Sequence, residues 1–105
     1  MTNVTELTGK EFQEFVKHGL VLVDFSAEWC MPCLIMAPIL EDMAKKFKGK
    51  IRFAKIDIDD NRGISEKFKI FSIPNFILFK DGIVLDRFVG SMPEEDFEER
   101  LREYL

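Results

Sequence analysis

One stretch decides how the whole chain is interpreted: Leu20-Val21-Leu22-Val23-Asp24-Phe25-Ser26-Ala27-Glu28-Trp29-Cys30-Met31-Pro32-Cys33. Its first six residues form a continuous, mostly aliphatic run that is too short for a typical helix, and such a run predicts a strand covered on both faces. From Cys33 to about Lys48, apolar residues recur at spacings of three and four, which predicts a helix that Pro38 is expected to kink. The two cysteines therefore lie where a buried strand passes into a helix.

Helices and strands are predicted to alternate along the rest of the chain. A first helix is expected to start with the capping-box pattern Thr8-Gly9-Lys10-Glu11, to carry Leu7 and Phe12 as a hydrophobic staple, and to end near His18. The remaining predicted elements are a strand from Ile51 to Ile58, a short helix capped by Asp59 or Asp60, strands from Phe76 to Lys80 and from Ile83 to Val89 joined by the turn Asp81-Gly82, and a last helix opened by a second capping box, Ser91-Met92-Pro93-Glu94. This order, αβαβαββα, predicts an α/β fold in which a mixed sheet has helices on both faces, within one domain spanning residues 1–105.

Composition and charge exclude several classes of protein. Of the 105 residues, 47% are apolar and 32% are charged, which is the composition of a globular domain rather than of a disordered chain. With 15 basic and 19 acidic residues the net charge is −4, which argues against a nucleic-acid partner, and no stretch approaches the roughly 20 apolar residues of a membrane helix. Nothing at the N-terminus resembles a signal peptide. We therefore expect a cytoplasmic monomer with neither a nucleic-acid nor a membrane partner.

The position of the two cysteines predicts redox chemistry. Cys30 lies at the expected start of a helix, where free backbone N–H groups and the helix dipole stabilise a thiolate and lower the pKa of the thiol from about 8.5 toward neutrality. Cys33 follows one turn later and faces inward, close enough to attack a disulfide formed at Cys30. Pro32 suits the first turn of a helix and stiffens the loop between the sulfurs. The pair can therefore cycle between dithiol and disulfide.

Two other interpretations of the cysteines compete with this one. A zinc site needs four ligands, and beyond these two sulfurs the chain offers one histidine and no further cysteine. A pair of inert core thiols fits poorly with Trp29 and Pro32, which are typical of an exposed turn. We therefore expect no metal and no cofactor, only a reversible Cys30–Cys33 disulfide.

Several motifs at matching separations resemble the thioredoxin family. They are the stretch from Val23 to Cys33, then Pro38, Lys55-Ile56-Asp57, Ile73-Pro74 before a strand, Asp81-Gly82 and Gly90, and together they cover essentially the whole chain in order. The resemblance implies a thioredoxin fold, with a central mixed sheet flanked by four helices and the redox site at one end. It also implies a disulfide reductase whose partners are disulfide-containing proteins and a thioredoxin reductase or equivalent electron donor.

The resemblance also implies roles for residues outside the cysteine pair. Asp24 matches a carboxylate that lies beneath the resolving cysteine and helps to move its proton; burial should raise its pKa, and a surface-facing strand residue is the alternative. Lys55 matches the partner of that carboxylate, with a snorkelling edge lysine as the alternative. Pro74 matches a cis-proline opposite the cysteines, which leaves the Ile73 backbone free to pair with an extended substrate. The expected substrate-binding residues are Trp29, Met31, Pro32, Ile73, Pro74 and Gly90.

Three residues depart from the familiar pattern of the family. Met31 stands where a glycine is usual, Leu34 where a basic residue is frequent, and Ser26 where a tryptophan is common. The rim of the site is therefore expected to be more apolar and less positive, which favours apolar partner surfaces and leaves the redox poise open. The alternatives are a disulfide oxidase or isomerase of the same fold and a non-enzymatic binding module; the signature of a glutaredoxin is not evident.

Overall fold

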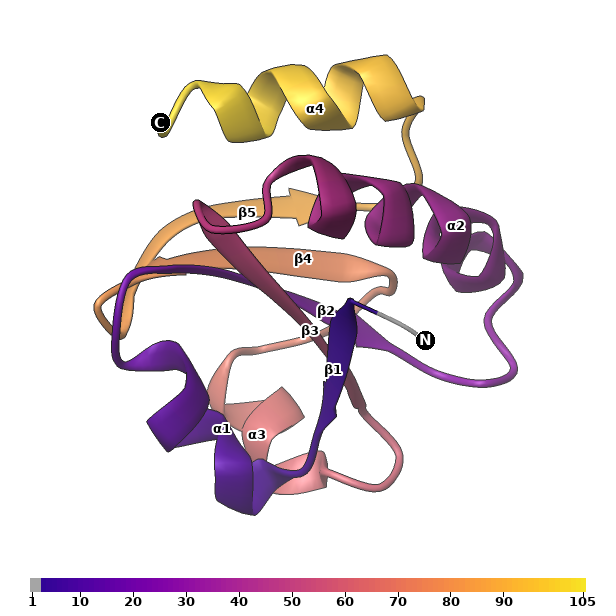
Figure 1. Ribbon diagram of the computed structural model, residues 1–105. Coiled ribbons are helices and arrows are strands. Elements are labelled where there is room, and N and C mark those ends of the chain that lie inside the picture. The colour runs from indigo at the N-terminus through magenta and orange to yellow at the C-terminus, as the bar shows by residue number, and fades with distance from the viewer. Residues whose placement is uncertain (1–2) are drawn as a thin grey trace.

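The computed structural model describes residues 3–105, which form five strands and four helices (Figure 1). In chain order the elements are β1 (Val4–Leu7), α1 (Gly9–Val16), β2 (Leu20–Ser26), α2 (Met31–Lys46), β3 (Ile51–Asp57), α3 (Arg62–Lys67), β4 (Asn75–Lys80), β5 (Ile83–Val89) and α4 (Glu94–Arg102). No helix within these residues is long and apolar enough to cross a membrane.

The strands form one mixed sheet in the order β1-β3-β2-β4-β5. Strands β1, β3 and β2 are parallel, whereas β4 pairs antiparallel with both β2 and β5. The mixed sheet and the four helices confirm the predicted thioredoxin fold, but the predicted order lacked β1. That strand has only four residues and exposes Thr5 and Glu6 in succession, so its sequence lacks the alternation of apolar and polar residues that predicts a strand.

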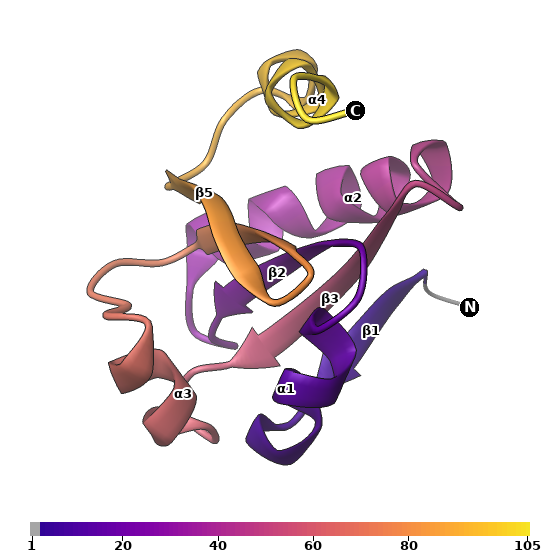
Figure 2. The same ribbon diagram turned by 90° about the vertical axis from the view of Figure 1, so that its left-hand side faces the viewer.

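Helices cover both faces of the sheet and enclose two apolar cores. Helices α2 and α4 lie over one face, and α1 and α3 lie over the other, as Figures 1 and 2 show. Phenylalanines dominate each core: Phe76, Phe88 and Phe97 lie on the α2 side, and Phe12, Phe25 and Phe79 lie on the α1 side. Strand β2 is buried along nearly its whole length, as its aliphatic run predicts. Its acidic residue, Asp24, is therefore buried as well.

Several predicted helix ends were wrong by a few residues. Helix α1 ends at Val16 rather than near His18, and α2 begins at Met31, before Cys33. Helix α3 is capped by Asn61 rather than by Asp59 or Asp60. In the first capping box the Glu11 carboxylate accepts the backbone N–H of Thr8 at 2.9 Å.

The second predicted capping box does not form. Pro93, with φ −60° and ψ 149°, is itself the N-cap of α4, and no side chain caps this helix. The preceding residue explains the difference, because the Met92 side chain packs against the core and its backbone nitrogen lies 3.5 Å from the Met36 sulfur. This contact holds the segment against α2, so the helix starts at Glu94 instead of continuing back to Ser91.

Candidate redox site

Cys30 and Cys33 form a disulfide at the N-terminus of α2. Cys30 is the N-cap of the helix, its Cα lies 5.2 Å from that of Cys33, and its sulfur accepts the Cys33 backbone N–H at 3.2 Å. The positive end of the helix dipole and a backbone donor therefore both face the Cys30 sulfur. This is the environment that stabilises a thiolate when the disulfide is reduced.

The turn that carries the cysteines is exposed, but the cysteines themselves are covered. Trp29 and Met31 are 67% and 65% exposed, whereas Cys30 and Cys33 are 3% and 5% exposed. Pro32 is also exposed. The cysteines pack in a small apolar cluster with Ala27, against which Ile58 and Ile73 are placed. An incoming disulfide must therefore approach Cys30 through the surface that its flanking residues form.

The segment before β4 forms the opposite wall of the site. The Ile73–Pro74 peptide bond is cis, as the resemblance implies, and Ile73 packs against the cysteine cluster. Gly90 has φ +92°, a conformation that favours glycine, and its backbone N–H donates to the Pro74 carbonyl at 2.8 Å. Ile73, Pro74 and Gly90 are thus brought together although the first and the last are 17 positions apart in the chain.

Trp29 is held in place by a residue that the sequence interpretation missed as part of the site. Its indole Nε1–H donates to the Asp59 carboxylate at 2.7 Å. Asp59 follows β3, and Trp29 follows β2; the two strands are parallel, so their carboxyl ends meet at one edge of the sheet. Asp59 could have been placed beside Trp29 from the sequence, because each residue follows closely after one of two strands that were predicted to share a sheet.

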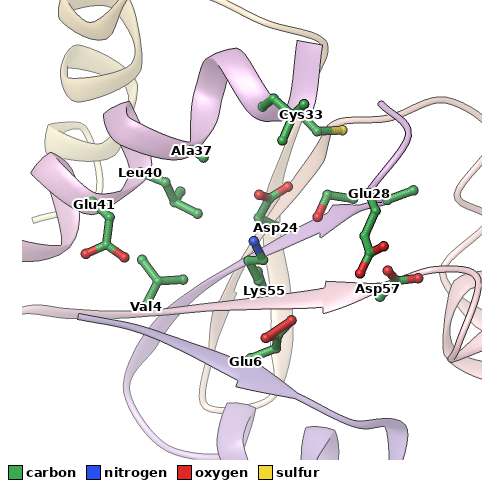
Figure 3. A pocket seen from close by; sticks show the side chains of 13 residues that line it. Val4, Glu6, Asp24, Glu28, Cys33, Ala37, Leu40, Glu41, Lys55 and Asp57 are labelled. Atoms are coloured by element: carbon green, nitrogen blue, oxygen red, sulfur yellow. The ribbon is translucent and has the colours of Figure 1, made fainter. Parts of the chain in front are cut away.

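Asp24 is buried beneath α2 and lines a cavity that Cys33 also lines. It is 3% exposed, which excludes the alternative of a surface-facing residue. The cavity has a volume of about 460 Å³, and Figure 3 shows the Asp24 carboxylate below Cys33. The pKa of Asp24 is raised to about 7, because burial disfavours the charged carboxylate by more than the Lys55 ammonium stabilises it. The Asp24 Oδ1 atom is buried and has no hydrogen-bond partner among the described residues.

Lys55 lies next to Asp24 on the neighbouring strand. The two residues are paired in the register of β2 and β3, and in Figure 3 the Lys55 nitrogen points toward Asp24. Lys55 is half-buried and forms no ion pair with any carboxylate of residues 3–105. It therefore acts on Asp24 through the field of its charge rather than through a closed salt bridge.

Exposed apolar side chains flank the site residues along the chain. Leu34 and Ile35 on the first turns of α2 are 54% and 60% exposed, and they extend the surface that Trp29 and Met31 begin. Phe71, on the segment that leads to Ile73, is 88% exposed and was not among the predicted substrate-binding residues. Large apolar side chains left in solvent around a functional site are typical of a protein-binding surface.

The side chains of the site are suited to two-electron chemistry at the sulfurs of Cys30 and Cys33. Within the described part of the chain, no three His, Cys, Asp or Glu side chains are grouped as metal ligands. The two sulfurs alone can accept and return two electrons as a dithiol–disulfide couple, with a buried carboxylate at hand for one proton.

Comparisons with known proteins agree with this geometry. A family model described as Thioredoxin matches residues 3–103. Curated proteins named Thioredoxin are similar to the chain over 102 residues: the one from Staphylococcus haemolyticus is 41% identical, that from Staphylococcus saprophyticus 39% and that from Staphylococcus aureus strain Mu50 40%. Each of these alignments covers 97% of the chain and 98% of the relative.

Proposed function

This chain belongs to the thioredoxin family of protein thiol–disulfide oxidoreductases, and from that premise we propose that it works as a reductase of protein disulfides. The observation that carries the proposal is the cysteine pair at the start of α2, with the ionisable Asp24 in the cavity that Cys33 lines. The family implies disulfide-containing substrates and a reductase partner. It also implies that no cofactor is needed.

The proposed reaction proceeds through two exchanges at sulfur. The Cys30 thiolate attacks one sulfur of a substrate disulfide, so that a mixed disulfide forms and the other substrate sulfur leaves as a thiolate. Cys33 then loses its proton and attacks the Cys30 sulfur. The substrate leaves as a dithiol, and the protein holds the Cys30–Cys33 disulfide until an external electron donor reduces it.

Asp24 is proposed to accept the Cys33 proton in the second exchange. A pKa of about 7 means that the carboxyl exchanges its proton near neutral pH, where a general base works best. Lys55 supplies a positive charge beside the Asp24 carboxylate, which has to be ionised before it can accept the proton. Both residues act on the resolving step and not on the first attack, which the N-terminus of α2 assists.

The proposed substrate is an extended segment bearing apolar side chains near its cysteine. Its backbone would pair with Ile73 in the manner of an added strand, while Trp29, Met31, Pro32, Pro74 and Gly90 shape the groove. The cytoplasm and a monomeric state remain our expectations for where and how the protein works.

A trap for the mixed disulfide tests the proposed function. Replacing Cys33 with serine removes the resolving thiol and leaves the attacking one, so substrate proteins should accumulate as adducts joined to Cys30. Adducts are read by non-reducing electrophoresis and mass spectrometry, with the Cys30→Ser/Cys33→Ser protein as the control. Absence of adducts would refute the reductase and favour a binding module. The equilibrium of the Cys30–Cys33 couple of the unmodified protein with glutathione separates a reductase from an oxidase, because an oxidase has the higher reduction potential.

Leu34 is predicted to limit the reactivity of Cys30. A lysine there would add a positive charge one residue beyond Cys33, close to the N-terminus of α2, and should raise the fraction of Cys30 thiolate at neutral pH. We expect Leu34→Lys to increase the rate of alkylation of reduced Cys30 by iodoacetamide several-fold at about pH 6, with Leu34→Gln as an uncharged control. Equal alkylation rates and equal rates of substrate reduction in the two variants would contradict this role of Leu34.

A further inference from the structure

Three charged residues form a row across the sheet beneath α2. The register pairs Glu6 of β1 with Lys55 of β3, and Lys55 in turn with Asp24 of β2. Because both strand pairs are parallel and in register, the three side chains project from the same face. Figure 3 shows them in order below Cys33: Asp24, then Lys55, then Glu6.

Burial changes steadily along this row. Asp24 is buried, Lys55 is half-buried and Glu6 is exposed on the edge strand. The row therefore joins the carboxyl that lies under Cys33 to solvent at the edge of the sheet. Lys55 occupies the middle, with a carboxylate on each side.

Among the described residues that line the cavity, carboxylates outnumber cations. Its lining includes Glu6, Asp24, Glu28, Glu41 and Asp57, and among residues 3–105 Lys55 is the one cationic residue that lines it. These groups come from every element that faces Asp24 in the cavity: β1, β3, the loop after β2 and helix α2, which also brings Cys33. Several acids thus compete for the Lys55 ammonium, and Glu6 and Asp24 are the two that stand directly opposite Lys55 in the sheet.

We propose that Glu6 is a positioning residue that shares the Lys55 ammonium with Asp24 and so keeps that ammonium from closing an ion pair with Asp24. The geometry that supports this is the central place of Lys55 in the row, together with the absence of an ion pair between Lys55 and any described carboxylate. The consequence for catalysis rests on the proposed function, because it matters only if Asp24 takes the proton of Cys33.

Removing the Glu6 charge should release Lys55 toward Asp24. In Glu6→Gln the ammonium keeps one attractive partner in the row, so the ionised form of Asp24 becomes more favourable. We expect the pKa of Asp24 to fall by about half a pH unit, which is about a threefold change in the ratio of ionised to protonated carboxyl. The pH dependence of the resolving step should move to lower pH by the same amount.

The direct test is a titration of the Asp24 carboxyl carbon by NMR in the oxidised protein. Glu66→Gln serves as a matched control, because it removes an exposed acid from α3 on the opposite face of the sheet and should leave the titration unchanged. Thermal unfolding of each variant checks that the fold is kept. A titration of Glu6→Gln that coincides with that of Glu66→Gln would overturn the proposal.

A double-mutant cycle separates positioning from a direct charge effect. Lys55→Met removes the ammonium and keeps an unbranched side chain, so in this background Glu6→Gln should no longer move the titration of Asp24. A shift of equal size with and without Lys55 would mean that Glu6 acts on Asp24 through space, and would overturn the proposal. If the titration shifts as expected but the pH dependence of resolution does not, Glu6 still positions Lys55, and it is the proposed role of Asp24 that fails.

Discussion

Replacing Cys30 with serine is expected to reduce the rate of protein-disulfide reduction by at least about 10³-fold. A serine hydroxyl stays protonated at neutral pH and cannot form the mixed disulfide, so the first exchange is lost. The fold should survive, because serine is a favoured N-cap and its oxygen can accept the Cys33 N–H that the Cys30 sulfur now accepts at 3.2 Å. The measurement is the rate of reduction of a model protein disulfide at fixed concentration of reductant.

A conservative change at a neighbouring exposed position provides the control for that experiment. Met31→Leu keeps an apolar side chain of similar volume in the groove and leaves both sulfurs, so its rate should stay within a few-fold of the unmodified protein. A Cys30→Ser protein that kept a tenth or more of the original rate would exclude Cys30 as the attacking group. A biological role that persisted in Cys30→Ser despite the loss of reduction would identify a non-enzymatic binding module.

The central strand and the cysteine pair were predictable because their signals are local. The run from Leu20 to Phe25 is apolar on both faces, and the start of α2 is marked by the cysteines and Pro32 themselves. Strand β1 was missed because it has only four residues, two of them exposed in succession, so its sequence shows no alternation of apolar and polar residues. It is a strand because it pairs with β3. The start of α4 at Glu94 likewise depends on how Met92 packs against Met36.

The environment of Asp24 shows where sequence reasoning reaches its limit. A lone carboxylate in an apolar strand predicts burial and a raised pKa, and both hold. The lining of the cavity depends instead on register, because Glu6 and Lys55 are 49 positions apart in the chain and meet only when β1 pairs with β3. The link between Trp29 and Asp59 has the same origin in the parallel pairing of β2 and β3.

Asp24→Asn is expected to make the protein more stable at alkaline pH. The pKa of Asp24 is about 7 in the folded protein against an ordinary value of 3.8, so the unfolded state releases this proton first as the pH rises. The carboxyl therefore costs no stability below about pH 4, costs progressively more up to about pH 7, and above that costs on the order of 4 kcal/mol. Asparagine does not titrate, which should remove most of this loss. The measurement is the free energy of unfolding in urea at about pH 4 and about pH 8.

The same substitution should also slow the step that Asp24 is proposed to assist, so that stability and activity move in opposite directions. Without the carboxylate, Cys33 loses its proton only to solvent, and we expect resolution to slow by about 10²-fold or more near neutral pH while the first attack by Cys30 is unchanged. Asp60→Asn is the matched control, because Asp60 is exposed after β3 and outside the cavity, and it should alter neither the slope of stability against pH nor the rate of resolution.

A gain in stability without slower resolution would show that Asp24 is a buried acid that does not take the proton of Cys33. If Asp24→Asn slowed resolution but left the pH dependence of stability as in the unmodified protein, the Asp24 carboxyl would be ionised in the folded protein between about pH 4 and about pH 8. Only the two effects together identify a carboxyl kept buried, at a cost in stability, for the proton that it moves.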